Sequence, residues 1–352
     1  MKHPSLLDIV LMKFFSKSPY LSLVVTSRND DNEALHRMQI FLNGFISQVQ
    51  IYKLSCELII VEWNYPADRP RLIQALECPQ INDWCTIRII SVPPEIHNRF
   101  ENSDVIPLFQ MIAKNVGIRR AHGRFVLATN IDILFSHELV KYLASRKLRK
   151  NRMYRIDRYD VPGSVPNSLP IDELVNWCPR NVLRVYRHLE ILEVRDGAIP
   201  VRRKKRKKLA EMVSEWFSRE EPILHTNACG DFTLLSREYW ERVSGYPEFP
   251  LRAMKLDGLL CYAAYYTGAK EIILNDPMRI YHLDHPARGD GADVALSERQ
   301  SAPCPGIQVD RIQYKELVEQ MRQTRKPIIF NDEGWGLADV NLPEIIAMKR
   351  QR

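Results

Sequence analysis

Asn130 and Asp132 are the residues whose types and spacing best suit the binding of a divalent cation. They directly follow an apolar run at 124–129, which places the Asp132 carboxylate at the end of a predicted buried strand. Oxygen ligands of this kind are the ones that Mg²⁺ and Mn²⁺ prefer. Asn and Asp also favour turns, so an ordinary turn is the alternative interpretation of this segment.

His282 and His285 form a second group that could bind a metal ion, with Asp284 between them. They come after an apolar run at 271–274, which predicts a late strand. Neutral imidazole is a common metal ligand, although a single histidine is more often packed in a core. Because two histidines and an aspartate fall so close together, we expect His282 or His285 to join Asp132. A bound histidine would need a defined partner for its second ring nitrogen.

The first half of the chain alternates apolar runs with helical patterns, and this order would position the candidate ligands. Strands are predicted near 21–26, 56–62, 86–92 and 124–129, and helices near 32–46, 68–76 and 105–116. This alternation predicts a mostly parallel sheet with helices on both faces, and ligands of such sheets bind beyond the carboxyl ends of the strands. Three polar clusters are expected to meet at that edge: Ser27 with Arg28, Glu62 with Trp63, and Asn130 with Asp132.

The second half of the chain is less regular. Residues 157–222 interrupt the alternation with a helical pattern at 172–192 and a basic run at 202–208, and we interpret them as an insertion or lid. A strand at 230–236 and helices from 237, at 256–264 and at 309–324 follow. The predicted organisation is a docking helix at 1–19, a nucleotide-binding half at 20–156, the insertion at 157–222, an acceptor-binding half at 223–300 and a C-terminal extension at 301–352.

Charge and hydropathy narrow the class of protein and its partners. The formal net charge is +7, and the unbroken run at 202–208 carries seven positive charges, so the rest of the chain is close to neutral. This run has no interleaved aromatic residue to stack on bases, so the expected partner is an anionic membrane surface or lipid-linked substrate rather than nucleic acid. No apolar stretch is long enough to span a bilayer, and we expect a cytoplasmic protein. The apolar segment at 6–15 contains Asp8 and Lys13, which favours a docking helix over peripheral membrane attachment.

The run from Lys114 to Gly123, followed by a strand and by Asn130 to Asp132, resembles the segment that leads to the DxD element in glycosyltransferases of the GT-A fold. The likeness is to the family 2-like enzymes, in which Asn-x-Gly and Ala-x-Gly precede the metal-binding aspartates. It implies an α/β, GT-A-like (Rossmann-like) fold with a mostly parallel central sheet and helices on both faces. It also implies a hexosyltransferase with Mn²⁺ or Mg²⁺ as cofactor, of a kind used in polysaccharide biosynthesis.

The resemblance also implies roles for individual residues. Asp132 with His282 or His285 would hold the metal ion, and Asp257 would be the catalytic base, with Asp231 as the second candidate. Two positions depart from the family pattern, because Asn130 replaces the first aspartate and Leu256 replaces an acid before Asp257. The residues expected to bind the donor are Ser27, Arg28, Glu62, Trp63, Asn115, Arg119 and Asn130.

The function implied is transfer of a sugar from a UDP- or GDP-type donor to a saccharide or lipid-linked acceptor, with inversion preferred over retention. A nucleotidyltransferase could use a related sheet and metal ion, but it normally needs a glycine-rich phosphate loop after the first strand. Residues 27–30 contain no glycine. The alternative from another class is a non-catalytic protein that binds nucleic acid through the run at 202–208, with salt-dependent affinity.

Overall fold

The computed structural model describes residues 18–78, 83–165, 170–194, 223–285 and 307–347. The docking helix predicted at 1–19 lies almost wholly outside these ranges, and so do the basic run at 202–208 and the first residues of the C-terminal extension, 301–306. None of the helices in the described ranges is long and apolar enough to cross a membrane.

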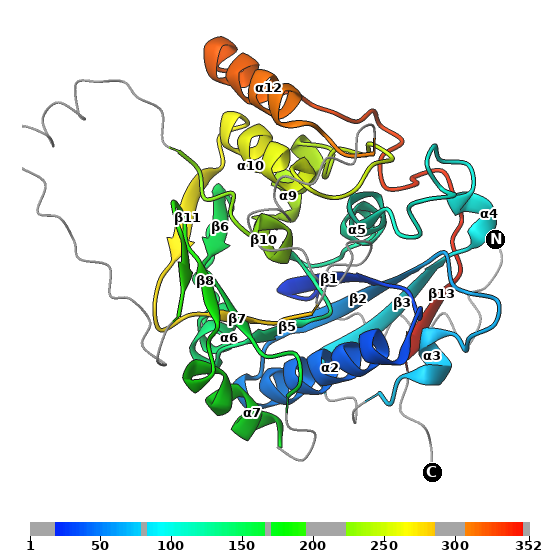
Figure 1. Ribbon diagram of the computed structural model, residues 1–352, viewed down its shortest axis with the longest axis vertical. Coiled ribbons are helices and arrows are strands. Elements are labelled where there is room, and N and C mark those ends of the chain that lie inside the picture. The colour runs from blue at the N-terminus through cyan, green and yellow to red at the C-terminus, as the bar shows by residue number, and fades with distance from the viewer. Residues whose placement is uncertain (1–17, 79–82, 166–169, 195–222, 286–306, 348–352) are drawn as a thin grey trace, which may run out of the picture.

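A large sheet of eight strands forms the centre of the fold, in the order β11-β6-β10-β4-β1-β2-β3-β13 (Figure 1). Strands β1 to β4 pair in parallel, which confirms the predicted mostly parallel α/β fold. Their Val, Ile and Leu side chains are buried on both faces, as parallel sheets require. β10 interrupts this pattern by running antiparallel to both β4 and β6. The central strands are β1 (Leu21–Ser27), β2 (Cys56–Trp63), β3 (Cys85–Val92) and β4 (Phe125–Thr129).

Helices cover both faces of this sheet (Figure 1), and the sheet divides the hydrophobic core into two layers. On one face, Leu23 and Val25 of β1 pack with Met38 and Phe41 of α2 (Asn32–Tyr52). On the other face, Val24 belongs to the core of α5 (Gln110–Arg119) and α10 (Leu256–Tyr266). Successive residues of β1 therefore supply opposite layers, because side chains alternate along a strand.

A second sheet of five strands, in the order β5-β12-β7-β8-β9, lies beside the first. The segment interpreted as an insertion or lid contributes three of its strands, and the helix predicted at 172–192 is wrong beyond its first turns. The helix formed there, α7 (Ile171–Trp177), is short, and the chain then forms short strands that pair antiparallel. The strands are β5 (Ile133–Phe135), β7 (Arg158–Val161), β8 (Arg184–Tyr186), β9 (Ile191–Glu193) and β12 (Ile280–Leu283).

The other elements agree with the predicted positions more closely. The helix predicted at 105–116 begins later, at Gln110, because residues 98–109 form turns after the short α4 (Pro94–His97). Residues 344–347 add an unpredicted edge strand, held to β3 by an ion pair between Arg88 and Glu344. The remaining elements are α3 (Leu72–Ala75), α6 (His137–Ala144), β6 (Arg152–Ile156), β10 (Phe232–Ser236), α9 (Arg237–Arg242), β11 (Lys270–Leu274), α12 (Arg311–Thr324) and β13 (Glu344–Ala347).

Candidate metal and active site

Asp132 lies in the turn between β4 and β5, where the chain leaves the large sheet for the second one. β12 pairs antiparallel with β5, and this register sets His282 opposite Ile133. The backbone N–H of Leu283 donates to the carbonyl of Asp132 at 2.9 Å, which extends the pairing by one step. Strand pairing therefore brings the predicted ligands together, although they are about 150 residues apart in the sequence.

The side chains of Asp132, His282 and His285 each offer a ligand atom, and these atoms all lie within 4.8 Å of one another. Oδ2 of Asp132 is 3.0 Å from Nε2 of His285 and 3.7 Å from Nε2 of His282. The other oxygen, Oδ1 of Asp132, is buried and has no hydrogen-bond partner. A buried, unpartnered carboxylate oxygen beside two imidazoles fits a cation site, since it otherwise bears an uncompensated desolvation cost.

His282 lies between two carboxylates, and this arrangement controls its charge. Its Nδ1 is 3.3 Å from Oδ1 of Asp160, while its Nε2 faces Asp132. Burial alone would lower the pKa of His282, but the two carboxylates raise it to about 10. Burial would likewise raise the pKa of Asp132, but His282 and His285 hold it far below its usual range. A carboxylate on the second ring nitrogen is the usual support of a metal-binding histidine.

A second cluster of potential ligands, made of Asp160, His282 and Asp284, is already neutralised by arginines. Arg158 pairs with Asp160 at 2.9 Å, and Arg184 contacts both Asp160 and Asp284 at 3.3 and 3.1 Å. With these cations in place, the cluster is less suited to a metal ion than the group around Asp132.

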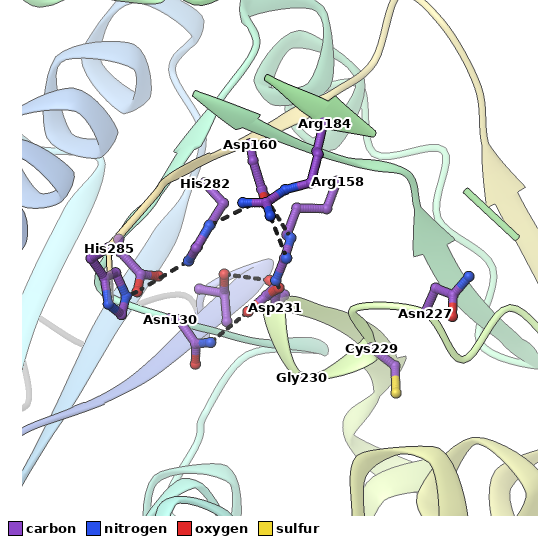
Figure 2. A network of polar contacts seen from close by, with 12 residues as sticks. Asn130, Arg158, Asp160, Arg184, Asn227, Cys229, Gly230, Asp231, His282 and His285 are labelled. Carbon is purple, nitrogen blue, oxygen red and sulfur yellow. Dashed lines mark hydrogen bonds and ion pairs between the residues drawn. The ribbon is translucent and has the colours of Figure 1, made fainter. Parts of the chain in front are cut away.

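Asp231 is held on both sides by hydrogen bonds (Figure 2). Asn130 Nδ2 donates to its Oδ1 at 2.6 Å, and Arg158 Nη1 donates to its Oδ2 at 2.7 Å. Because Arg158 also contacts Asp160, which faces His282, these contacts connect Asp231 to the ligand group. Asn130 is fixed from its other side by Gln110 at 2.9 Å. Asp231 therefore holds the side chains of Asn130 and Arg158 in place.

Asp257 lies at the start of α10, on the other side of the loop that carries Gly230. A Cβ atom at position 230 would come within 3.0 Å of Oδ2 of Asp257, so glycine is what lets the carboxylate approach the loop this closely. Burial raises the pKa of Asp257 above its usual value. A raised pKa is what a general base for a sugar hydroxyl requires.

Lys114 is a buried cation whose charge is influenced by Asp231, Asp257 and Asp132. Its side chain is fully buried, and Nζ donates to the carbonyl of Gly230 at 2.7 Å. Burial lowers the pKa of Lys114 to about 8, against the opposing attraction of Asp231, Asp257 and Asp132. A buried lysine whose pKa is shifted by burial and by nearby carboxylates is a candidate functional residue.

No protein-family model and no curated protein matches the chain. Among solved structures, the catalytic domain of Drosophila beta1,4-galactosyltransferase 7, crystallised with xylobiose, is similar with a TM-score of 0.36 and 9% sequence identity. The similarity covers 81% of this chain and 80% of that one. At this TM-score the likeness is too distant to assign an activity.

Two of the predicted donor-binding residues belong to the interior instead. Trp63 is fully buried, and its Nε1 donates to Nδ1 of His97 at 2.8 Å, so its ring cannot stack on a nucleobase. Asn115 is also fully buried, and its side chain exchanges hydrogen bonds with the backbone of Tyr246 and with Glu248. The expectation that these two residues contact the donor is therefore wrong.

Glu62 and Arg119 are also engaged elsewhere. Glu62 is 1% exposed, and its oxygens accept from the backbone of Leu72 and from the Arg71 guanidinium, at 2.7 and 2.6 Å. Arg119 is at the far end of α5 from Gln110, and it lies 4.9 Å over the ring of Trp335. Ser27 and Arg28 do stand at the carboxyl end of β1, where Arg28 pairs with Asp30 at 3.0 Å.

Arg158 and Asp160 are the site residues that the sequence interpretation overlooked. They lie two residues apart on β7, so their side chains share one face of the strand. An Arg-x-Asp pair in an otherwise polar segment is a recognisable signal. The interpretation of residues 157–222 as an insertion gives this pair no role.

Proposed function

We propose that the protein is a metal-dependent glycosyltransferase that moves a hexosyl group from a UDP- or GDP-type sugar to a saccharide or lipid-linked acceptor. The observation that carries this proposal is the convergence of Asp132, His282 and His285 at the carboxyl end of β4, with one Asp132 oxygen buried and unpartnered. This edge is where an α/β sheet binds its ligands.

Asp132, His282 and His285 would hold Mn²⁺ or Mg²⁺. A divalent cation bound there would offset the negative charge of the departing nucleoside diphosphate. The same donor set is compatible with Fe²⁺ or Zn²⁺, so the choice of metal is part of the test. Asp160, on the second nitrogen of His282, would orient that imidazole.

Asp257 is the better candidate for the base, because both oxygens of Asp231 already accept hydrogen bonds from Asn130 and Arg158. Asp257 would take the proton of the acceptor hydroxyl. At the same time the hydroxyl oxygen would bond to the anomeric carbon of the donor sugar, and the bond from that carbon to the diphosphate oxygen would break. Attack from the opposite side inverts that carbon. Lys114, held between the acids, would limit the rise in the Asp257 pKa.

The nucleoside would bind near Ser27 and Arg28, since Glu62 and Trp63 are enclosed by their own partners. Arg28 is a suitable diphosphate ligand, because a guanidinium binds phosphate oxygens in pairs. Its pairing with Asp30 would have to open or adjust for that contact.

Thermal unfolding with UDP or GDP, each alone and with Mn²⁺, Mg²⁺, Fe²⁺ or Zn²⁺, tests the proposal. A nucleotide that binds the native state raises the midpoint by mass action. We expect stabilisation by at least one nucleotide that depends on Mn²⁺ or Mg²⁺. No nucleotide-dependent shift with any metal, or a shift with Fe²⁺ alone that ignores nucleotides, would exclude the proposed reaction.

A further inference from the structure

The edge of the large sheet opposite the candidate site is strongly basic. Residues 143–152 join α6 to β6 without a single acidic residue. Four side chains of this connection, Arg146, Lys147, Arg149 and Lys150, are exposed. The connection is well anchored, because the Tyr20 hydroxyl accepts from the backbone N–H of Leu148 at 3.2 Å. The backbone that carries these four cations is therefore held in place.

Strand register adds further cations to the same edge. Lys270 pairs with Arg152 at the start of two parallel strands, β11 and β6. The backbone N–H of Arg237 donates to the carbonyl of Arg124 at 3.1 Å, where β10 ends beside the start of β4. Two acidic side chains of α9 also face this region and offset part of its positive charge. Glu238 pairs with Lys150 and Arg242, and Glu241 pairs with Arg237.

This concentration of charge is local, since the chain outside 202–208 is close to neutral. It is also physically separate from the candidate site. Asp132 follows the last residue of β4, whereas the basic edge surrounds its first residue, Phe125. A five-residue strand spans roughly 16 Å at about 3.3 Å per residue, so the two regions can bind different partners.

The described chain enters the fold at this edge. The carbonyl of Pro19 accepts from the backbone N–H of Arg124 at 3.2 Å, and Arg146 lies 5.5 Å over the ring of Tyr20. The sequence just before this point, at 6–15, is largely apolar, with Lys13 within it and Lys17 after it. A lipid bilayer can receive both apolar side chains and cations, whereas a nucleic acid has nothing to receive apolar side chains.

We propose that this edge, made of Arg124, Arg152, Arg237, Lys270 and the cations at 146–150, binds the surface of an anionic lipid bilayer. Lysine and arginine side chains near such a surface are attracted to it, and the attraction is screened by salt. In this orientation the carboxyl ends of the strands, and with them the candidate site, face away from the bilayer. On this proposal, residues 6–15 serve in peripheral membrane attachment instead of forming the docking helix expected from the sequence. The inference does not depend on the proposed reaction.

Vesicle co-sedimentation of the full chain tests this. We expect binding to vesicles of phosphatidylcholine with about 30% phosphatidylserine, little binding to phosphatidylcholine alone, and loss of binding at about 0.5 M NaCl. An edge variant with Arg146→Glu, Lys147→Glu, Arg149→Glu and Lys150→Glu should bind about tenfold or more weakly. It should fold normally, because these side chains are exposed and the anchoring bonds are made by the backbone.

A matched control reverses four charges on and beside α12, far along the chain: Arg311→Glu, Lys315→Glu, Arg325→Glu and Lys326→Glu. It should bind like the wild type. A third variant, with the seven cations at 202–208 changed to Gln, distinguishes the contribution of the edge to vesicle binding from that of the 202–208 run. It should retain most of the binding.

Three results would overturn the proposal. The first is absence of binding to anionic vesicles by the wild type. The second is equal loss in the edge variant and the α12 control, which would indicate a net-charge effect. The third is full loss in the 202–208 variant with none in the edge variant. Preference for duplex DNA over anionic vesicles, abolished in the edge variant, would reassign the surface to nucleic acid.

Discussion

Nε2 of His285 lies 3.0 Å from Oδ2 of Asp132, across 153 residues of sequence. The pairing of β12 with β5 produces this contact, because it sets His282 opposite Ile133 and leaves His285 just beyond the strand. The second sheet therefore brings the histidines to the candidate metal site, while β4 of the large sheet leads directly into the turn that carries Asp132.

Replacing Asp132 with Asn should abolish metal-dependent nucleotide binding. The amide keeps the shape of the side chain but removes the charge that balances His282 and would hold a cation. We expect Mn²⁺ affinity, measured by calorimetry, to fall at least about 100-fold, since even the loss of a supporting group costs 10- to 100-fold. Asp339→Asn, an exposed change in the C-terminal segment, is the control and should bind Mn²⁺ normally. Equal Mn²⁺ affinity in both variants would remove Asp132 from the site.

Asp257→Asn should lower kcat by about 10²- to 10⁴-fold with little change in the KM for the donor, as loss of a general base does.

In the wild type, the rate should rise with pH as Asp257 loses its proton. Since burial raises its pKa, this rise should lie above the pH at which an ordinary aspartate titrates. Asp231→Asn serves as the contrast, because it leaves Arg158 without one of its partners and should lower the unfolding midpoint. Full activity in Asp257→Asn would exclude the base role.

Lys114→Met should move the acid side of the pH–rate profile to higher pH, by about one pH unit. The reason is that the Lys114 cation favours the ionised form of Asp257, so its removal lets burial raise that pKa further. Methionine keeps much of the volume and apolar stem of the fully buried side chain. A profile that stays in place, or moves to lower pH, would show that Lys114 does not act on Asp257.

Protonation of Glu57 in acid should lower the stability of the protein. Burial would raise its pKa, but His122, Arg88 and Ser22 hold the pKa at about 2, against 4.5 for the ordinary side chain. A carboxyl with a depressed pKa contributes stability above its unfolded pKa and loses it as the pH falls through the folded one. We therefore expect a loss of about 3 kcal/mol in the free energy of unfolding between about pH 4.5 and 2.

Urea unfolding at several pH values measures this effect, with Glu57→Gln as the comparison. The variant should be less stable than the wild type at pH 7, because Arg88 loses one of its two carboxylate partners. Its stability should also depend less on pH in the acid range. Parallel pH dependence in the two proteins would show that another group is responsible.

Much of this architecture could be predicted from the sequence. The parallel strands are long apolar runs, and the polar residues that end them mark the edge where Asp132 lies. His282 and His285 stand out because two imidazoles are so close together. What the sequence could not supply was the register of β12 on β5, which depends on two segments far apart in the chain.

The errors have a common physical cause, because burial depends on segments that local patterns cannot place. Trp63 ends a strand and looks available for stacking, but α4 and the turns after it bring His97, Phe100 and Phe109 against its ring. Asn115 lies in a family-like motif, yet the chain at Gly245 and Tyr246 closes over it. The strands β7 to β9 are only three or four residues long, too short for a clear alternation.

Anomalous diffraction from crystals soaked with Mn²⁺ and UDP would locate the metal ion. We expect one strong manganese peak bounded by the Asp132 carboxylate and the imidazole of His282 or His285, with the diphosphate on its open side. That peak should vanish in Asp132→Asn crystals and persist in Asp339→Asn crystals. A peak between Asp160 and Asp284, or UDP bound with no metal near Asp132, would contradict this expectation.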